Sequence, residues 1–229
     1  MFSNFQYAYL VANLLVLPIW VILFIHRKDL RKEMLITSVV VGIIALLTEP
    51  FFLQDYWHPQ IFNGWTVGIE DFLYGFILGG IASMIYKEIC GKIYSKKHDR
   101  KYHWGRLLIP FLILSIFIFV FGKIVVNLNT MHASLISLLF AIIFIIYYRH
   151  DLLIDSIISG LLVSIITFLG FLIFLKIFPG IIETWWFVHN LNGIFVFGIP
   201  SEELLWAFGL GAVAGPFYEF FTGLRFKKS

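Results

Sequence analysis

Long apolar runs recur along almost the whole chain and constrain its fold more than any other feature of the sequence. The chain has 229 residues, of which 60% are hydrophobic and only 14% are charged, whereas a soluble domain carries about 25% charged residues. A run of roughly 20 apolar residues can cross a bilayer as a helix. The sequence therefore predicts an all-α integral membrane protein with seven transmembrane helices. We place them near residues 6–25, 34–53, 69–90, 107–126, 131–148, 152–178 and 200–221.

The positively charged residues indicate how these helices are oriented. Fifteen of the 17 Lys and Arg residues fall at one end of the predicted helices, and only Lys123 and Lys176 lie toward the other. Short loops rich in Lys and Arg stay on the cytoplasmic side. We therefore expect a multi-pass protein of the cell membrane, with the N-terminus outside and the C-terminus cytoplasmic. The basic charge belongs to these loops and gives no reason to expect nucleic acid as a partner.

One short pattern occurs twice. Residues 68–76 read GIEDFLYGF and, at a constant offset of 132, residues 200–208 read PSEELLWAF. The third and seventh helices are an even number of spans apart, so they cross the membrane in the same direction. We therefore expect a parallel 3+1+3 internal repeat. Its parts are residues 1–95, a basic loop and linker helix at 96–128, and a second three-helix repeat at 129–229.

Each copy of the pattern carries two adjacent acids, Glu70 and Asp71 in the first and Glu202 and Glu203 in the second. An acid in the first helical turn favours the positive end of the dipole, which is the purely structural interpretation. Two pairs at repeated positions near membrane depth favour a functional one. Because neighbouring carboxylates resist joint ionisation, one acid of each pair should keep its proton. Such a pair can donate a proton and accept one back.

Helical spacing predicts what lies beside the acids. Tyr74 follows Glu70 by four residues and Trp206 follows Glu202 by four, so each aromatic ring shares a face with an acid. A neighbouring face of both helices carries small residues, which allow close helix approach in lipid. We expect the two helices to pack tightly on their neighbours, or on each other, below an aromatic-walled cavity. Glu49, near the outer end of the second helix, either joins the acidic cluster or is interfacial.

Other patterns give no support for a cofactor or a metal. Residues 209–214 fit a loose G-x-G-x-x-A dinucleotide pattern, but no strand precedes them and they lie within an apolar span. The His residues lack the spacing of zinc ligands. Cys90 is the single cysteine, so an internal disulfide is excluded.

The repeated acidic pattern within a seven-span chain resembles the small membrane lycopene cyclases of the heterodimeric type. In that family two homologous three-span halves are encoded separately, or are fused with an extra helix. Its hallmark is Pro-x-Glu-Glu/Asp before an aromatic-rich helix. The second copy matches at Pro200, Glu202 and Glu203, whereas the first has Gly68 at the proline position. This departure leaves open whether the first acidic pair is catalytic, supporting or vestigial.

The resemblance implies a proton-initiated cyclisation of the end group of lycopene or a related terpenoid. An acid protonates a terminal alkene, the cation closes a six-membered ring, and a base removes a proton, without net redox change or a required cofactor. The resemblance makes Glu202 or Glu203 the acid/base residue, with Glu70 and Asp71 as the partner pair. Which carboxyl gives the proton and which takes it stays open.

The resemblance also assigns aromatic residues to the substrate. Trp206 and Tyr74 would flank the cation. Trp65, Trp185 and Trp186 either line an outer entrance or belong to the aromatic belt at the membrane interface.

Two other classes of protein fit the same repeat. A small-solute transporter would favour polar residues near the midplane, whereas the acids lie near the outer helix ends. A non-catalytic assembly protein would tolerate substitution of the acids. An intramembrane Glu-Glu protease would need an Arg shortly after the pair, and residues 204–211 contain none. The expected partners of a cyclase are a lipid-soluble polyene and membrane lipid, and the chain could form a homo-oligomer.

Overall fold

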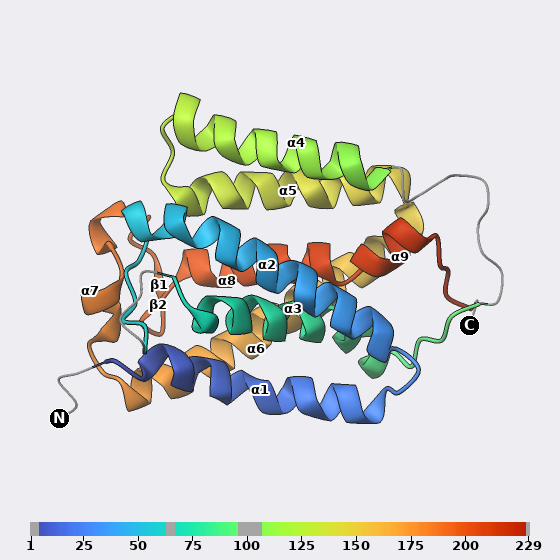
Figure 1. Ribbon diagram of the computed structural model, residues 1–229, viewed down its shortest axis with the longest axis horizontal. Coiled ribbons are helices and arrows are strands. Elements are labelled where there is room, and N and C mark those ends of the chain that lie inside the picture. Colours follow the sequence, from blue (N-terminus) through green and yellow to red (C-terminus); the bar gives the residue numbers. More distant parts are fainter. Residues whose placement is uncertain (1–4, 63–66, 96–106, 228–229) are drawn as a thin grey trace.

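The computed structural model describes residues 5–62, 67–95 and 107–227 and shows an elongated helical bundle (Figure 1). Within these ranges, seven helices are long and apolar enough to cross a membrane, which confirms the predicted number. They span Ala8–His26, Arg31–Asp55, Ile69–Ile89, Leu108–Val125, Thr130–Tyr148, His150–Ile177 and Ser201–Thr222.

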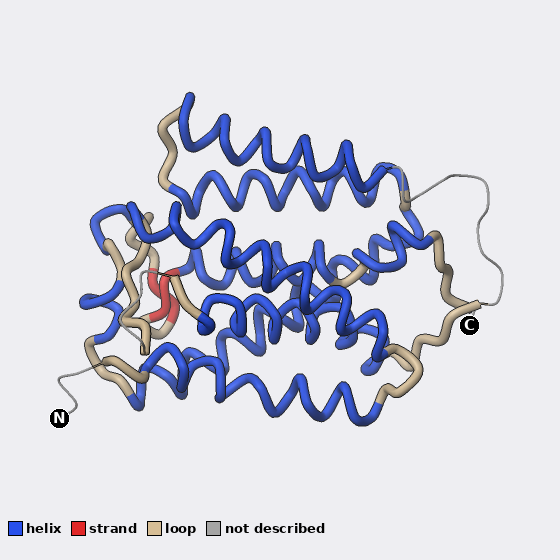
Figure 2. Tube along the Cα trace, in the orientation of Figure 1, coloured by secondary structure: helices blue, strands red, loops and turns tan. Residues whose placement is uncertain are grey.

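The observed elements follow the predicted ones closely, with additions in the outer loops. The helices are α1 (Ala8–His26), α2 (Arg31–Asp55), α3 (Ile69–Ile89), α4 (Leu108–Val120), α5 (Thr130–Tyr148), α6 (Leu153–Ile177), α7 (Ile181–Trp185), α8 (Ser201–Ala214) and α9 (Phe217–Thr222). Shorter helical turns are η2 (Phe121–Val125), η3 (His150–Leu152) and η4 (Val188–Asn190), and a small hairpin pairs β1 (Phe195–Val196) with β2 (Ile199–Pro200). Figure 2 shows this hairpin among the loops at one end of the bundle.

The predicted seventh helix is broken into α8 and α9 at Gly215 and Pro216. Proline has no backbone N–H, so the carbonyl four residues earlier, that of Ala212, loses its helical donor. The hydroxyl of Ser156 on α6 donates to this carbonyl over 2.7 Å. The break is therefore satisfied by a neighbouring helix, as the absence of water in lipid requires.

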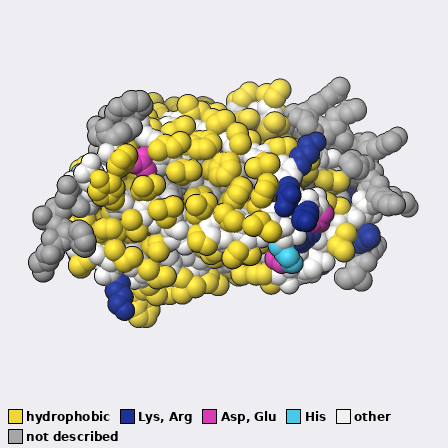
Figure 3. All heavy atoms as spheres, turned by 60° about the horizontal axis from the view of Figure 1, so that its bottom comes forward, with side chains coloured by type: hydrophobic (Ala, Val, Ile, Leu, Met, Phe, Trp, Pro, Cys, Tyr) yellow, Lys and Arg dark blue, Asp and Glu magenta, His cyan; other side chains and the backbone are white. Residues whose placement is uncertain are grey.

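The helices form two groups around α3 and α8. α3 packs on α1 and α2, and α8 packs on α5 and α6, while α4 lies outside against α5 (Figure 1). Both α3 and α8 begin at the end of the bundle that holds α7 and the hairpin. The C-terminus lies toward the opposite end. Hydrophobic side chains cover most of the face in Figure 3, and Lys and Arg side chains gather mainly near one end, as expected for a surface in lipid.

Glycines set the closest helix contacts. A Cβ atom on Gly75 would stand 2.7 Å from the carbonyl oxygen of Val41, and one on Gly211 would stand 2.7 Å from the carbonyl oxygen of Ser159. The small-residue faces therefore pack on α2 and α6, respectively. α3 and α8 also contact each other, as the expectation allowed.

The glycine contacts and the acids do not share one offset. Gly75 and Gly211 make equivalent contacts and are 136 residues apart, whereas the acidic pairs are 132 apart. The difference of four residues is about one helical turn. Asp71 therefore stands one turn before its contacting glycine, and Glu203 stands two turns before its own.

A buried ionic cluster lies at the other end of α3. Lys87 forms ion pairs with Glu33 of α2 and, over 2.6 Å, with Glu219 of α9. The hydroxyl of Tyr94 lies within hydrogen-bonding reach of both carboxylates. Lys87 also donates to the carbonyl of Gly215 at the helix break over 3.3 Å. The side chains of Lys87, Glu33 and Glu219 are at most 2% exposed. The cluster thus joins three helices inside the protein, although the sequence suggests only a basic loop there.

Candidate active site

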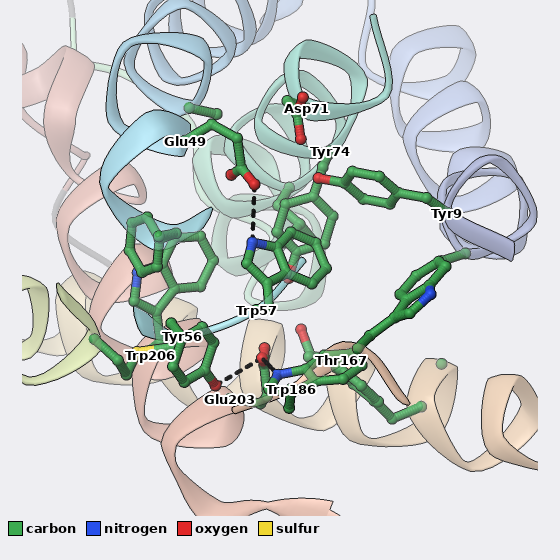
Figure 4. A pocket seen from close by; sticks show the side chains of 18 of the residues that line it. Tyr9, Glu49, Tyr56, Trp57, Asp71, Tyr74, Thr167, Trp186, Glu203 and Trp206 are labelled. Atoms are coloured by element: carbon green, nitrogen blue, oxygen red, sulfur yellow. Dashed lines mark hydrogen bonds between the residues drawn. The ribbon is translucent and has the colours of Figure 1, made fainter. Parts of the chain in front are cut away.

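A cavity lies at the end of the bundle where α3 and α8 begin, and residues of α1, α2, α3, α5, α6, α7 and α8 line it (Figure 4). Its volume is about 110 Å³, several times the roughly 10–15 Å³ that a buried water needs. Most of the wall is aromatic or aliphatic. Three carboxylic acids line it as well: Glu49, Asp71 and Glu203.

Glu203, in the first turn of α8, accepts two hydrogen bonds at one oxygen. The hydroxyl of Tyr56 donates to Oε1 over 2.8 Å, and the indole N–H of Trp186 donates over 2.9 Å. Burial, followed by the charge of Glu203, raises the pKa of Tyr56 well above its ordinary value of 10. The phenol therefore keeps its hydrogen at neutral pH. Both contacts favour the ionised form of Glu203.

Glu49 and Asp71 lie in the same cavity with fewer donors. The indole N–H of Trp57 donates to Oε1 of Glu49 over 2.8 Å. Oδ2 of Asp71 accepts the backbone N–H of Gly68 over 2.7 Å, which caps α3 as the structural interpretation expects. The hydroxyl of Tyr9 lies near Asp71, but Oδ1 has no partner in hydrogen-bond geometry among the described residues. In the described part of the chain, this oxygen of Asp71 therefore accepts no well-aligned hydrogen bond.

The other acid of each pair lies outside the cavity wall. Oε1 of Glu70 accepts the backbone N–H of Phe62 over 2.9 Å, and Oε1 of Glu202 accepts that of Asn192 over 2.6 Å. Each acid thus ties its helix to the loop that precedes it. The structure therefore brings one acid from each predicted pair, Asp71 and Glu203, to the cavity, and joins Glu49 to them.

The predicted aromatic residues lie mostly in the cavity wall. The rings of Tyr74 and Trp206 stack with their centroids 6.0 Å apart and their planes 16° apart. Trp185 and Trp186 also line the cavity and are only 1% and 3% exposed, so they are not belt residues on the surface. Trp65 lies outside the described residues.

The two outer loops pair with each other above the cavity. The backbone N–H of His58 donates to the carbonyl of Trp185 over 2.8 Å, and that of Phe187 donates to Tyr56 over 2.9 Å. Tyr56, Trp185 and Trp186 are all buried beneath these contacts. The aromatic residues of the two loops therefore close over the cavity and form part of its wall.

Some lining residues carry no signal that sequence analysis could use. Tyr9 is one aromatic residue in the first apolar span, and Tyr56 and Trp57 stand in a loop rich in aromatic residues. Thr167 offers a weak signal, because it is a polar residue inside an apolar span. Threonine in such a span commonly bonds its own backbone, whereas the hydroxyl of Thr167 is buried and has no partner among the described residues.

The fold and the cavity define a class of protein: a multi-pass membrane protein with a buried, aromatic-walled cavity that three carboxylic acids line. Among the described residues, no group of three or more His, Cys, Asp and Glu side chains is arranged to hold a metal ion.

The comparison with protein families identifies the class more closely. The family described as lycopene cyclase matches residues 6–89 and 129–221, which make up most of the chain. The chain therefore belongs to the lycopene cyclase family, as its two acidic motifs suggest. The family supports a carotenoid cyclase function in general, a lipophilic polyene as substrate and a membrane environment. No curated protein and no solved structure matches the chain.

Proposed function

We propose that the protein cyclises an end group of lycopene, or of a related polyene, by a proton-initiated isomerisation in the cavity. One observation carries this proposal: carboxylic acids from α2, α3 and α8 line a single apolar cavity with an aromatic wall. The reaction needs a proton donor and a proton acceptor that are held apart from water. It also produces a carbocation, which aromatic rings stabilise.

The proposed roles follow the positions of the residues. Asp71 and Glu203 face the substrate and exchange protons with it, and the stacked pair of Tyr74 and Trp206 lies beside the cation. Glu70 and Glu202 position these groups by fixing the loops before α3 and α8. An isomerisation changes no oxidation state, so this chemistry requires no redox cofactor.

We also propose that residues 1–95 and 129–229 are two parallel repeats joined by a linker helix. The family match falls in two segments, and residues 90–128 lie between them. Glu70 and Glu202 make the same contact to a loop amide, and the glycines of α3 and α8 make the same contacts to α2 and α6. Each of these observations supports a three-helix unit that occurs twice in the chain.

The proposed orientation places the N-terminus outside and the C-terminus in the cytoplasm. Cys90, the single cysteine, is exposed at the end of α3 that would be cytoplasmic. A membrane-impermeant maleimide should label it only after the cells are opened. In a Cys90→Ser background, Thr184→Cys on the exposed part of α7 should react in intact cells. Labelling of Cys90 in intact cells would contradict the orientation.

The decisive test of the function is expression in cells that accumulate lycopene, followed by chromatography of the pigments. We expect γ- or β-carotene with the wild-type chain and about 10²-fold less cyclised product, or lower still, with Glu203→Gln. Glu183→Gln, an exposed acid on α7, is the matched control and should keep full activity. Unchanged lycopene in the presence of well-folded wild-type protein would reject this substrate.

A further inference from the structure

We infer that the three acids of the cavity divide the proton chemistry between two sides. Glu203 is the base, and Glu49 and Asp71 together hold the proton that starts the reaction. This inference rests on the proposed function. It adds Glu49, which lies outside both repeated acidic pairs, as a catalytic residue.

The partners of Glu203 favour its ionised form. Its Oε1 accepts one hydrogen bond from the phenol of Tyr56 and one from the indole of Trp186. The indole N–H can only donate, and the phenol donates here while it keeps its hydrogen. Two donors on one oxygen compensate a buried negative charge. A carboxylate held in this way is ready to take a proton from a cation.

Among the described residues, neither Glu49 nor Asp71 accepts two hydrogen bonds at one oxygen, as Glu203 does. Glu49 accepts a hydrogen bond from Trp57 and Asp71 accepts one from Gly68, while the hydroxyl of Tyr9 also lies near Asp71. Oδ1 of Asp71 has no hydrogen-bond partner in the described part of the chain. An ionised oxygen left unpaired in an apolar cavity is costly. A proton held by Glu49 or Asp71 neutralises one carboxylate and so avoids the cost of burying an unpaired charge.

The two acids also act on each other. Glu49 and Asp71 come from α2 and α3, which pack directly on each other, and both acids line the cavity. Two nearby carboxyls in a poorly solvated site cannot easily both be ionised, so they share a proton as a pair. The pair therefore supplies one proton, which is shared between Glu49 and Asp71.

The aromatic residues lie between the two sides of the cavity. In Figure 4, Glu49 and Asp71 occupy one side and Glu203 the other, with Trp57 and Tyr74 between them. A polyene end placed against these rings would meet the donor on one side and the base on the other. The cation would form beside the aromatic wall.

The steps balance in atoms and electrons. The proton of the Glu49–Asp71 pair adds to the terminal C=C bond, whose electron pair forms the new C–H bond. The resulting cation accepts the electron pair of a second C=C bond, which closes the ring. Glu203 then removes a proton beside the new cation, and the C–H electrons form the ring double bond. The product is an isomer of the substrate, and the proton returns from Glu203 to the pair before the next turnover.

The position of the ring double bond reports which residue is the base, because the base selects the proton that leaves. Glu49→Gln, Asp71→Asn and Glu203→Gln should be compared in the lycopene-accumulating cells, with Glu183→Gln as control. We expect Glu203→Gln to lower product by about 10²-fold or more and to give a mixture of ring isomers. Glu49→Gln and Asp71→Asn should each lower product but keep the wild-type isomer. The double variant should abolish cyclisation.

Folding is checked for every variant by size-exclusion chromatography in detergent, since only variants that elute as the wild type does are compared. A changed ring isomer in Asp71→Asn, with the wild-type isomer kept in Glu203→Gln, would reverse the assignment and overturn the inference. Wild-type product levels in Glu49→Gln would show that Glu49 is not a catalytic residue. Absence of cyclised product from folded wild-type protein would instead reject the proposed function.

Discussion

Tyr56 and Glu203 are 147 residues apart in the sequence, and a hydrogen bond of 2.8 Å joins their side chains in the wall of the cavity. Tyr56 directly follows α2, and Glu203 lies in the first turn of α8. The charge state of a residue in the second half of the chain therefore depends on a donor from the first half. Neither half alone provides a complete environment for this acid.

Removal of this donor should slow the reaction without unfolding the protein. A hydrogen bond to a charged group contributes about 1.5–3 kcal/mol, so Tyr56→Phe should lower the rate of cyclisation by roughly 10- to 100-fold. The measurement is the initial rate of product formation in membranes. Tyr147→Phe, which removes an exposed hydroxyl at 70% exposure, is the control. An unchanged rate in Tyr56→Phe would show that Glu203 does not need the phenol.

The same donor predicts a pH dependence. Burial raises the pKa of Tyr56 well above 10, so the native protein keeps the phenol proton where the unfolded chain loses it. The native state then binds more protons above pH 10, and its stability falls as pH rises beyond that value. Below pH 10 the phenol stays intact in both states. The ratio of wild-type to Tyr56→Phe rates should therefore be constant from about pH 7 to about pH 9. A ratio that falls toward one would contradict the raised pKa.

The stacked rings of Tyr74 and Trp206 should contribute to stabilising the cation. A cation near an aromatic face gains about 0.5–2 kcal/mol, so Trp206→Leu should lower the cyclisation rate by roughly 2- to 30-fold. Trp206→Phe keeps an aromatic face and should retain most of the activity. The comparison uses pigment chromatography at equal amounts of folded protein. Equal rates for the Phe and Leu variants would show that shape, rather than the aromatic face, matters at this position.

The glycine contacts predict a difference between two positions on the same helix. A Cβ atom on Gly160 would stand 2.8 Å from the backbone oxygen of Phe208, whereas one on Gly170 would meet Val16 at an ordinary 3.6 Å. Overpacking of this kind costs about 1–3 kcal/mol. Gly160→Ala should therefore lower the midpoint of thermal unfolding in detergent, and Gly170→Ala should not. Equal midpoints would show that α6 and α8 can separate without cost.

Much of the fold was predictable because the spans are strongly apolar. Hydrophobicity over about 20 residues locates a membrane helix regardless of its neighbours. The break in the last span was missed, although Pro216 is visible in the sequence. A membrane helix tolerates a proline when a neighbour satisfies the freed carbonyl, and only the structure shows that Ser156 does so.

The site was predictable where a pattern repeats and not where separate loops meet. The repeat identified Asp71 and Glu203 as candidate site residues, but it gave no reason to prefer them over Glu70 and Glu202. The structure shows that these two neighbours accept hydrogen bonds from loop amides instead. Tyr56 and Trp57 enter the site through the pairing of two outer loops. Local sequence does not encode such a contact. The buried partners of Lys87 were missed for the same reason, since they come from helices far apart in the chain.

The cluster around Lys87 should be essential for stability. Lys87 is fully buried and faces Glu33, Glu219 and, more remotely, Asp155. Removing one partner of a buried ion pair leaves uncompensated charge and costs about 3–5 kcal/mol. Lys87→Met should therefore strongly reduce the fraction of protein that stays folded after heating in detergent. Lys28→Met, an exposed lysine in the first loop, should have little effect.

A double-mutant cycle separates the ion pair from simple loss of packing at this position. If the penalty of Lys87→Met comes from a carboxylate left without its partner, Glu33→Gln in the same chain removes part of that charge. The double variant should then be destabilised by less than the sum of the two single variants, with a coupling of about 0.5–3 kcal/mol. The two single effects would add if Lys87 only filled space. Additivity would therefore contradict an electrostatic role for the cluster, even if Lys87→Met itself proved strongly destabilising.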